Sequence, residues 1–472
     1  MNISDDLDAY DRIFVVIVFI AIILRFIILN TGIVNILDNF LTDDAFYYYS
    51  IARNVVMGEG VVFSSGNPTN GFHPLYLIIL VPLFDLLYQY GINAPVYASL
   101  IILSVFTVGT SFFIYQVCKE LVGGFAGIVG TIIWLFNPYI IKVSLAGTET
   151  PIQIFFISVL TWYLVSINFS EINNKNIVII GALLGLIFLS RMDGVLMILS
   201  VVISLGSYWI GYSPSKIMNS IVEKDKRIYD LVKIGMIPSI VVFSWMGWSY
   251  MHVQRLTPVS GAALRLLRLN LNQNHFHWIL SSIKGTINSI QNMIIFVEFD
   301  GVSVLVIILL TLVPLTVITI AISMEDIAEN IKSIDFLIIT FVLFLFFYWF
   351  ITMAMRSWYT LFISFILTIL VSISIGNTVK SISFRQDNIV KLLITIVIIL
   401  SFVIGGFVQY DSSPEEPIRY QDASYIRQNI QTGVTIGSFN SGIRQYYTPN
   451  HTVVNLDGVV NVEAYRARSR GK

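Results

Sequence analysis

The sequence predicts an all-α polytopic membrane protein with a small α/β domain at its C-terminal end. Of its 472 residues, 56% are hydrophobic and 12% are charged, whereas about 25% of a typical soluble domain is charged. Mean hydropathy is +0.78, long apolar segments recur along the chain, and the composition turns polar after residue 410. Together these observations exclude a soluble globular protein.

About eleven apolar segments are long enough to be transmembrane helices, for which roughly 17 to 25 residues are needed. They centre on residues 13–30, 96–117, 123–141, 150–167, 177–189, 195–211, 234–252, 302–323, 336–355, 359–375 and 390–408. The first segment has no small-residue cleavage site after it, so we interpret it as a retained anchor.

The side of the membrane that each loop faces follows from its basic residues. Loops 211–234 and 375–390 are rich in lysine and arginine, which predicts a cytoplasmic location. Segment 74–90 contains Pro74, Pro82 and Asp85, so we expect it to lie at the interface or re-enter rather than cross. Loops 31–95 and 253–301 are then extracytoplasmic, in a multi-pass protein of the plasma membrane.

We expect two domains. Residues 1–410 form the transmembrane domain, and residues 411–472 form a small extracytoplasmic domain with a helix at 418–430 and strands at 434–439 and 452–456. The sequence ends before a sheet could be completed, which leaves a truncated domain or an added tail as the two interpretations.

Two adjacent carboxylates, Asp43 and Asp44, open a predicted helix over residues 42–57. Thr42 suits the N-cap, and acidic residues in the first turn suit the helix macrodipole, so the pair could be a simple helix start. The alternative is that the two carboxylates take part in a reaction. Small and aromatic residues at helical spacing predict that this helix lies on the membrane, with Arg53 and Asn54 facing water.

His73 ends a turn-rich loop and precedes Pro74, which favours an extended backbone at His73. A loop histidine is commonly a solvated polar group. Its position after the acidic helix makes substrate binding the alternative interpretation.

These features together resemble the first extracytoplasmic loop of the GT-C superfamily of integral-membrane glycosyltransferases. Thr42-Asp43-Asp44-Ala45, followed by Ala52-Arg53-Asn54 and the His73-Pro74 entry into an apolar helix, is most similar to the arabinofuranosyltransferase-like and protein-mannosyltransferase-like branches. The resemblance covers about the first 200 residues. It implies Asp43 as the catalytic base, Asp44 as a residue that orients the acceptor or a metal, and substrate contacts from Arg53 and His73.

Two further loops occupy positions that carry functional residues in the family. Glu149 stands where relatives more often have Asp, and Arg191 and Asp193 stand in an outer hairpin. The resemblance implies roles in substrate binding. The alternatives are a helix N-terminus at 148–151 and an interfacial ion pair. If the protein uses a divalent cation, Mg²⁺ or Mn²⁺, we expect Asp44 and Glu149 to hold it.

Loop 253–301 is unusually basic for an extracytoplasmic loop. Arg265 and Arg268 lie within one helical turn, and Arg356 lies between two later spans. They could anchor at the interface by snorkelling, or bind the phosphate of a lipid carrier. The resemblance favours the second interpretation.

The leading hypothesis is therefore a glycosyltransferase that moves a sugar from a polyprenyl (dolichyl or undecaprenyl) phosphate to a glycan, lipid or protein acceptor with inversion. Its partners are the lipid-linked donor, the acceptor and membrane lipids, without nucleic acid. The alternatives are a transporter or flippase for a polyprenyl-linked substrate, an oligosaccharyltransferase-like enzyme, and a non-catalytic glycan-binding relative.

Overall fold

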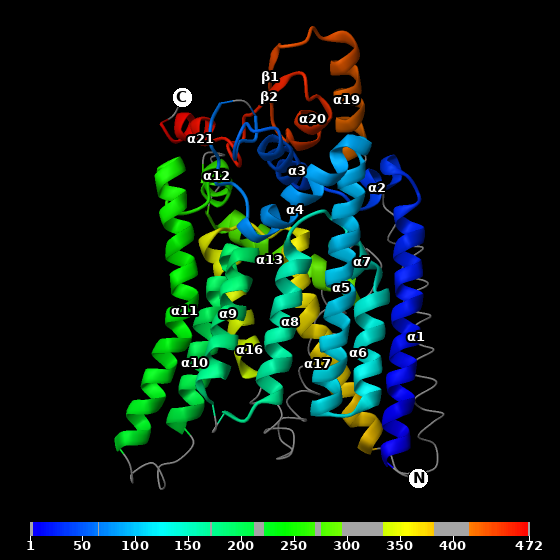
Figure 1. Cartoon of the computed structure of the whole chain (residues 1–472), viewed down its shortest axis with the longest axis vertical. Coiled ribbons are helices and arrows are strands. Elements are labelled where there is room, and N and C mark those ends of the chain that lie inside the picture. The colour runs from blue at the N-terminus through cyan, green and yellow to red at the C-terminus, as the bar shows by residue number, and fades with distance from the viewer. Residues whose placement is uncertain are drawn as a thin grey trace.

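The computed structural model describes residues 3–64, 66–169, 172–211, 221–269, 275–294, 334–381 and 415–470. Long helices run side by side, and shorter helices and the C-terminal segment gather at one end of this bundle (Figure 1). The predicted all-α class with a small C-terminal α/β domain is confirmed. Predicted spans 302–323 and 390–408 lie outside the described residues.

Five helices of the described part are long and apolar enough to cross a membrane. These spans lie in α1 (Ile3–Leu29), α5 (Ala94–Leu121), η3 (Met192–Gly194) with α10 (Val195–Gly211), α11 (Ile221–Val253), and η6 (Ser357–Thr360) with α17 (Leu361–Ser381). Shorter apolar helices lie beside them: α8 (Thr150–Ser166), α9 (Asn174–Ser190) and α16 (Asp335–Phe346), which continues into η5 (Phe347–Ile351). Large apolar side chains such as Val15, Phe19 and Phe26 on α1 are more than 60% exposed. Such an outer surface suits contact with lipid.

The predicted span over 123–141 is a bent pair of helices. The segment divides into α6 (Gly124–Phe136) and α7 (Pro138–Ser144), which are bent by 58°. Proline lacks the N–H that a continuous helix needs, so the helix breaks before Pro138. The Asn137 side chain then caps α7 by accepting hydrogen bonds from the N–H groups of Tyr139 and Ile140.

The upper layer contains α2 (Ile33–Asn39), α3 (Asp43–Val56), α4 (Pro74–Leu87) with η1 (Tyr88–Tyr90), α12 (Val259–Leu269) and α13 (His275–Ile294). Helix α4 has 14 residues, or about 21 Å at 1.5 Å per residue, which is shorter than a hydrocarbon core of about 30 Å. It lies beside α3 at the end of the bundle (Figure 1).

Helix α3 is surrounded by protein, which corrects the expectation that it lies on the membrane with a wet face. Ala45, Tyr49 and Ala52 are fully buried, and Arg53 is only 3% exposed. The loop before α8 contributes to this burial. Gly147 there has a φ of +77°, and a Cβ on it would lie 2.6 Å from the Ala45 Cβ, so the loop approaches α3 more closely than a residue with a side chain allows.

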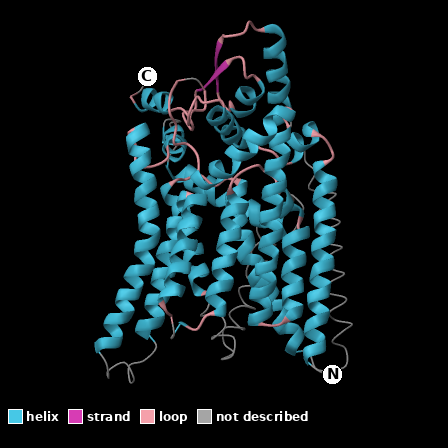
Figure 2. Cartoon of the chain, in the orientation of Figure 1, coloured by secondary structure: helices cyan, strands magenta, loops and turns pink. Residues whose placement is uncertain are grey.

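The C-terminal segment consists of α19 (Glu415–Asn429), β1 (Thr435–Ser438), α20 (Gly442–Tyr447), β2 (Thr452–Asn455) and α21 (Val462–Ser469). Strands β1 and β2 pair in parallel, with Thr435 opposite Thr452 and Ser438 opposite Asn455 (Figure 2). Helix α20 packs on α3. The predicted strands are therefore present, and the segment rests directly on the helix that carries the two aspartates.

Candidate active site

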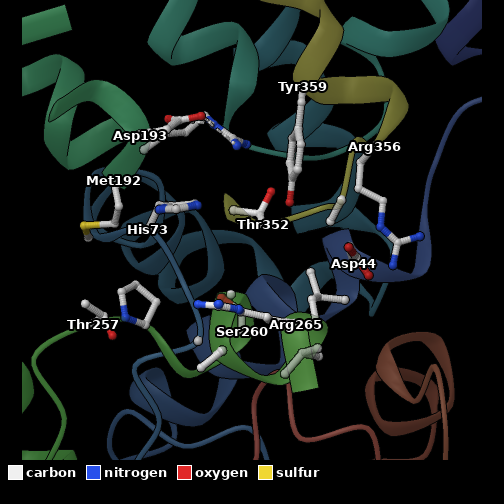
Figure 3. Close-up of a pocket in the computed structure, with 18 of the residues that line it drawn as sticks. Asp44, His73, Met192, Asp193, Thr257, Ser260, Arg265, Thr352, Arg356 and Tyr359 are labelled. Carbon is white, nitrogen blue, oxygen red and sulfur yellow. Dashed lines mark hydrogen bonds and ion pairs between the residues drawn. The ribbon is translucent and has the colours of Figure 1, made fainter. Parts of the chain in front are cut away.

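A cavity of about 740 Å³ lies under the C-terminal segment, among the short elements of the upper layer. Its lining comes from regions far apart in the sequence: α3, the loops at residues 71–73 and 148–149, the η3 turn, α12, the η5 to η6 connection, and the C-terminal segment (Figure 3). Charged and aromatic side chains share the walls with aliphatic ones, as is usual in a pocket for an amphipathic ligand.

Asp43 and Asp44 point in different directions. The Asp43 carboxylate is 5% exposed and accepts hydrogen bonds from the N–H groups of Gly442 (3.0 Å) and Ile443 (2.8 Å) at the start of α20. Asp44 lines the cavity and makes no hydrogen bond or ion pair with the described residues. Successive helical residues lie about 100° apart, since a turn has 3.6 residues, so one carboxylate faces α20 and the other the cavity.

The surroundings of Asp44 favour its protonated form. Burial is the main cause and raises the pKa of Asp44 to about 6; the Arg356 charge opposes the rise, and the charges of Asp43 and Asp457 add to it. Burial also raises the pKa of Asp43, against the effect of the two α20 N–H groups. A carboxyl group with a pKa close to neutrality can both accept and release a proton.

Thr42 occupies the N-cap position of α3, but it makes no side-chain cap. Its hydroxyl instead donates to the Ala146 carbonyl (3.1 Å). Thr42 thus occupies the expected N-cap position, but the loop before α8 takes up its hydroxyl.

One wall of the cavity is a buried ion-pair cluster. The Arg191 guanidinium pairs with Glu149 and with Asp193 (3.2 Å). The Tyr348 hydroxyl donates to Asp193 (2.6 Å), and the Tyr48 hydroxyl donates to Glu149 (2.8 Å). The charges on this wall are thus paired and hydrogen-bonded, which is the condition under which buried ions are tolerated.

Glu149 rather than Thr148 occupies the N-cap position of α8, without a side-chain cap. The Glu149 carboxylate is 3% exposed and also lies 3.6 Å from His73 Nε2. Its oxygens are taken up by Arg191, Tyr48 and His73, so its role in this structure is to hold the cavity wall together.

His73 lines the cavity and precedes α4 in an extended conformation. Its Nδ1 atom is buried without a partner among the described residues. Burial lowers the pKa of His73, and Glu149 opposes that effect. A histidine with a lowered pKa is neutral at pH 7 and can exchange a hydrogen bond with a substrate hydroxyl.

The arginines form a second group. Arg265 and Arg356 line the cavity, and Arg268 lies behind them over the Trp278 ring at 5.0 Å. Burial, followed by the nearby Arg356 charge, lowers the pKa of Arg268 to about 10. Within the described part of the chain, these three guanidinium groups have no carboxylate at ion-pair distance. Such a cluster is chemically matched to a phosphate group. The Arg356 guanidinium lies near the Asp44 carboxylate (Figure 3).

Comparison with known proteins finds one family profile that matches part of the chain and several solved structures of similar fold. The profile of the dolichyl-phosphate-mannose-protein mannosyltransferase family matches residues 90–245. The structure of ArnT from Cupriavidus metallidurans, bound to undecaprenyl phosphate, superposes with a TM-score of 0.59 at 9% identity, over 97% of this chain and 88% of that one. The chain therefore has the fold of ArnT, and part of its sequence matches the mannosyltransferase family profile.

A second solved structure has a similar fold. The oligosaccharyltransferase AglB from Archaeoglobus fulgidus, in complex with an inhibitory peptide and a dolichol-phosphate, superposes with a TM-score of 0.56 at 11% identity. The match covers 95% of this chain and 65% of that chain. No curated protein matches the chain by sequence.

The described residues around the cavity do not fit a bound divalent cation. Mg²⁺ and Ca²⁺ sites use several oxygen ligands, including carboxylates. Within the described part of the chain, Asp43, Glu149 and Asp193 are already bonded, and Asp457, which lines the cavity with Asp44, accepts hydrogen bonds from the N–H groups of Asn440 and Val459. Among the described residues, no three His, Cys, Asp or Glu side chains come together as a metal site would require.

The structure separates the predicted site residues into two sets. Asp44, His73, Glu149, Arg191, Asp193, Arg265 and Arg356 line the cavity, and Arg268 lies close to them. Asp43 and Arg53 do not line it. Arg53 donates to the Tyr446 carbonyl (2.8 Å) inside the protein, so the expectation of a water-facing Arg53 is corrected.

Sequence reasoning missed several lining residues. Tyr48 was expected to contact the membrane, and Tyr348 and Tyr359 fell within apolar stretches. Asn440 and Asp457 come from the C-terminal segment. No local pattern marks these residues, because their position depends on contacts between distant parts of the chain.

Proposed function

We propose that this protein is a GT-C glycosyltransferase, which moves one sugar from a polyprenyl phosphate to a hydroxyl group of a glycan, lipid or protein acceptor. The observation that carries the proposal is that Asp44 and Arg356 line the same cavity, and neither has an ion-pair partner among the described residues. The ArnT and AglB structures contain undecaprenyl phosphate and dolichol-phosphate, which supports a lipid phosphate as the donor's carrier.

In the proposed reaction, Asp44 is the general base. It takes the proton of the acceptor hydroxyl while the hydroxyl oxygen attacks the anomeric carbon and the bond from that carbon to the phosphate oxygen breaks. Attack opposite the leaving phosphate inverts the anomeric configuration. A pKa of about 6 leaves Asp44 ionised at pH 7 and still able to accept a proton.

Arg356, Arg265 and Arg268 would stabilise the leaving phosphate. Negative charge on the phosphate oxygens increases as the glycosidic bond breaks, and preorganised cations lower the barrier when they face that charge. We place the reaction on the extracytoplasmic side, since the basic loops 211–234 and 375–390 predict the opposite side as cytoplasmic.

We also propose that transfer needs no divalent cation. The support is the state of the carboxylates: the ones that could assist Asp44 are engaged by Arg191, Tyr48, Tyr348 or α20. The arginine cluster supplies positive charge at the place where a metal would act.

The test is transfer by the full chain in lipid nanodiscs, with synthetic polyprenyl-phosphate sugars as donors and simple glycosides as acceptors. The proposal requires donor-dependent product formation that Asp44→Asn reduces by at least about 100-fold. Wild-type turnover by Asp44→Asn with an active donor would refute Asp44 as the base.

A further inference from the structure

Helix α20 begins on the carboxylate of Asp43. Ser441 occupies the N-cap position of α20 without making a side-chain cap, and its hydroxyl accepts a hydrogen bond from Asn455 instead (3.0 Å). The first N–H groups of a helix need an acceptor. Asp43 provides it with both oxygens, to Gly442 and Ile443, and a carboxylate also suits the positive end of the helix dipole.

The other end of α20 is held by Arg53, which belongs to the same helix as Asp43. Its guanidinium donates to the carbonyl of Tyr446 in the last turn (2.8 Å) and lies 5.6 Å from the Tyr446 ring centre. A cation suits the negative end of a helix. Helix α3 therefore presents an anion and a cation to the matching ends of α20.

Helices α3 and α20 are in close contact between these two ends. Tyr47 accepts hydrogen bonds through its hydroxyl from the Ser441 N–H and from Asn455 (both 3.3 Å). The Phe46 ring lies 5.4 Å from that of Tyr446. A Cβ on Gly442 would lie 2.2 Å from the Asp43 carbonyl oxygen, so any larger residue at 442 must push α20 away from α3.

The segment just before α20 forms part of the cavity wall. Asn440 and Asp457 both line the cavity, and the Asn440 N–H donates to the Asp457 carboxylate (3.0 Å). The contact of Asp43 with α20 thus fixes two things at once: the rotation of α3 that presents Asp44, and the position of the wall formed by Asn440 and Asp457.

We infer that Asp43 and Arg53 are positioning residues, which hold α20 by its two ends and thereby set Asp44 and the Asn440 wall relative to each other. This inference rests on the proposed function for the role of Asp44. It gives the two adjacent aspartates separate tasks, and it makes the C-terminal segment a structural part of the site.

The experiment measures hydrogen exchange and kinetics on the full chain in nanodiscs. Asp43→Asn and Gly442→Ala should each speed amide exchange in α20 at least about tenfold, and should lower kcat roughly tenfold with donor KM within about threefold. Asp44→Asn is the matched control for exchange, because it makes the same chemical change one residue away and should leave α20 protection unchanged.

The pH profile separates positioning from catalysis. Groups that act on Asp44 are Arg356, Asp43, Asp457 and Glu149. Gly442→Ala removes none of them, so it should keep the acidic limb of kcat/KM that Asp44 produces, with a lower plateau. Arg53→Lys should retain more activity than Arg53→Met, since lysine keeps the cation that faces the Tyr446 carbonyl.

Two results would overturn the inference. One is unchanged α20 exchange in both Asp43→Asn and Gly442→Ala. The other is a loss beyond about 1,000-fold in Asp43→Asn with α20 exchange intact, which would assign Asp43 to the chemistry itself. Normal turnover by Asp44→Asn would instead refute the proposed base, while the exchange data would still test the contact with α20.

Discussion

Asp43 and Asp44 are chemically identical neighbours in two different surroundings. Asp43 faces protein backbone and has both oxygens bonded to N–H groups, whereas Asp44 faces a cavity that also contains Arg356. The difference comes from the rotation of about 100° per residue along a helix. A pair of acidic residues at a helix start can therefore divide structural and chemical work between its members.

The largest expected effect is that of changing Asp44, the aspartate that faces the cavity. Asp44→Asn should reduce transfer by roughly 10²–10⁴-fold, because an amide cannot accept the acceptor's proton. The variant should unfold at the same temperature as wild type or slightly higher at pH 7.5, since burial of the ionised group is unfavourable there. A clear loss of thermal stability with near-normal turnover would show that Asp44 belongs to the helix start instead.

The next effect concerns the cationic side of the cavity. Arg356→Ala, and the double change Arg265→Ala with Arg268→Ala, should each lower kcat/KM for the donor by roughly one to two orders of magnitude. A charge-assisted hydrogen bond contributes about 1.5–3 kcal/mol, which corresponds to that range. Arg255, which lies over the Tyr465 ring rather than in the cavity lining, is the matched control: Arg255→Ala should leave donor kcat/KM nearly unchanged. Unaffected kinetics in both arginine variants would indicate interfacial anchors.

A smaller effect is expected when the pH is lowered. Because the pKa of Asp44 is raised to about 6, the base is ionised above that pH and becomes protonated below it. The rate should be level above pH 7 and fall about tenfold per unit below pH 6. The measurement is kcat/KM between pH 5 and 8, with circular dichroism to exclude unfolding. A flat profile across this range would contradict the assignment.

The smallest expected effect is that of removing metal. Transfer should be unchanged after treatment with EDTA. Titration with Mg²⁺ or Mn²⁺ should give no saturable change in tryptophan fluorescence. Recovery of lost activity on adding one of these ions would place a cation in the cavity and contradict the proposed independence.

The fold could be predicted largely from the sequence because apolar length and loop charge determine it. Segments such as 96–117 and 359–375 are long and apolar enough for their helices to be evident. The break before Pro138 has a local cause, but its bend of 58° depends on how α7 packs, which the segment 123–141 does not reveal.

Site residues could be predicted where a local sequence pattern marks them. Asp44, His73 and Arg265 stand in recognisable loops, and all three line the cavity. Which aspartate faces the cavity was not predictable, since either could follow Thr42 at a helix start. That choice depends on where α20 begins, and the α20 N–H groups that meet Asp43 lie 399 and 400 residues further along the chain.

This sequence separation has a consequence for biosynthesis. Asp43 is translated about 400 residues before its partners Gly442 and Ile443, so α3 must wait for the synthesis of that whole stretch before the Asp43 carboxylate is satisfied. A contact of such high sequence separation forms late and closes a very long loop. A ribosome that stops before residue 442 would thus release a bundle in which α3 lacks the support of α20, and the nascent chain would lack the cavity wall formed by Asn440 and Asp457 until that segment is made.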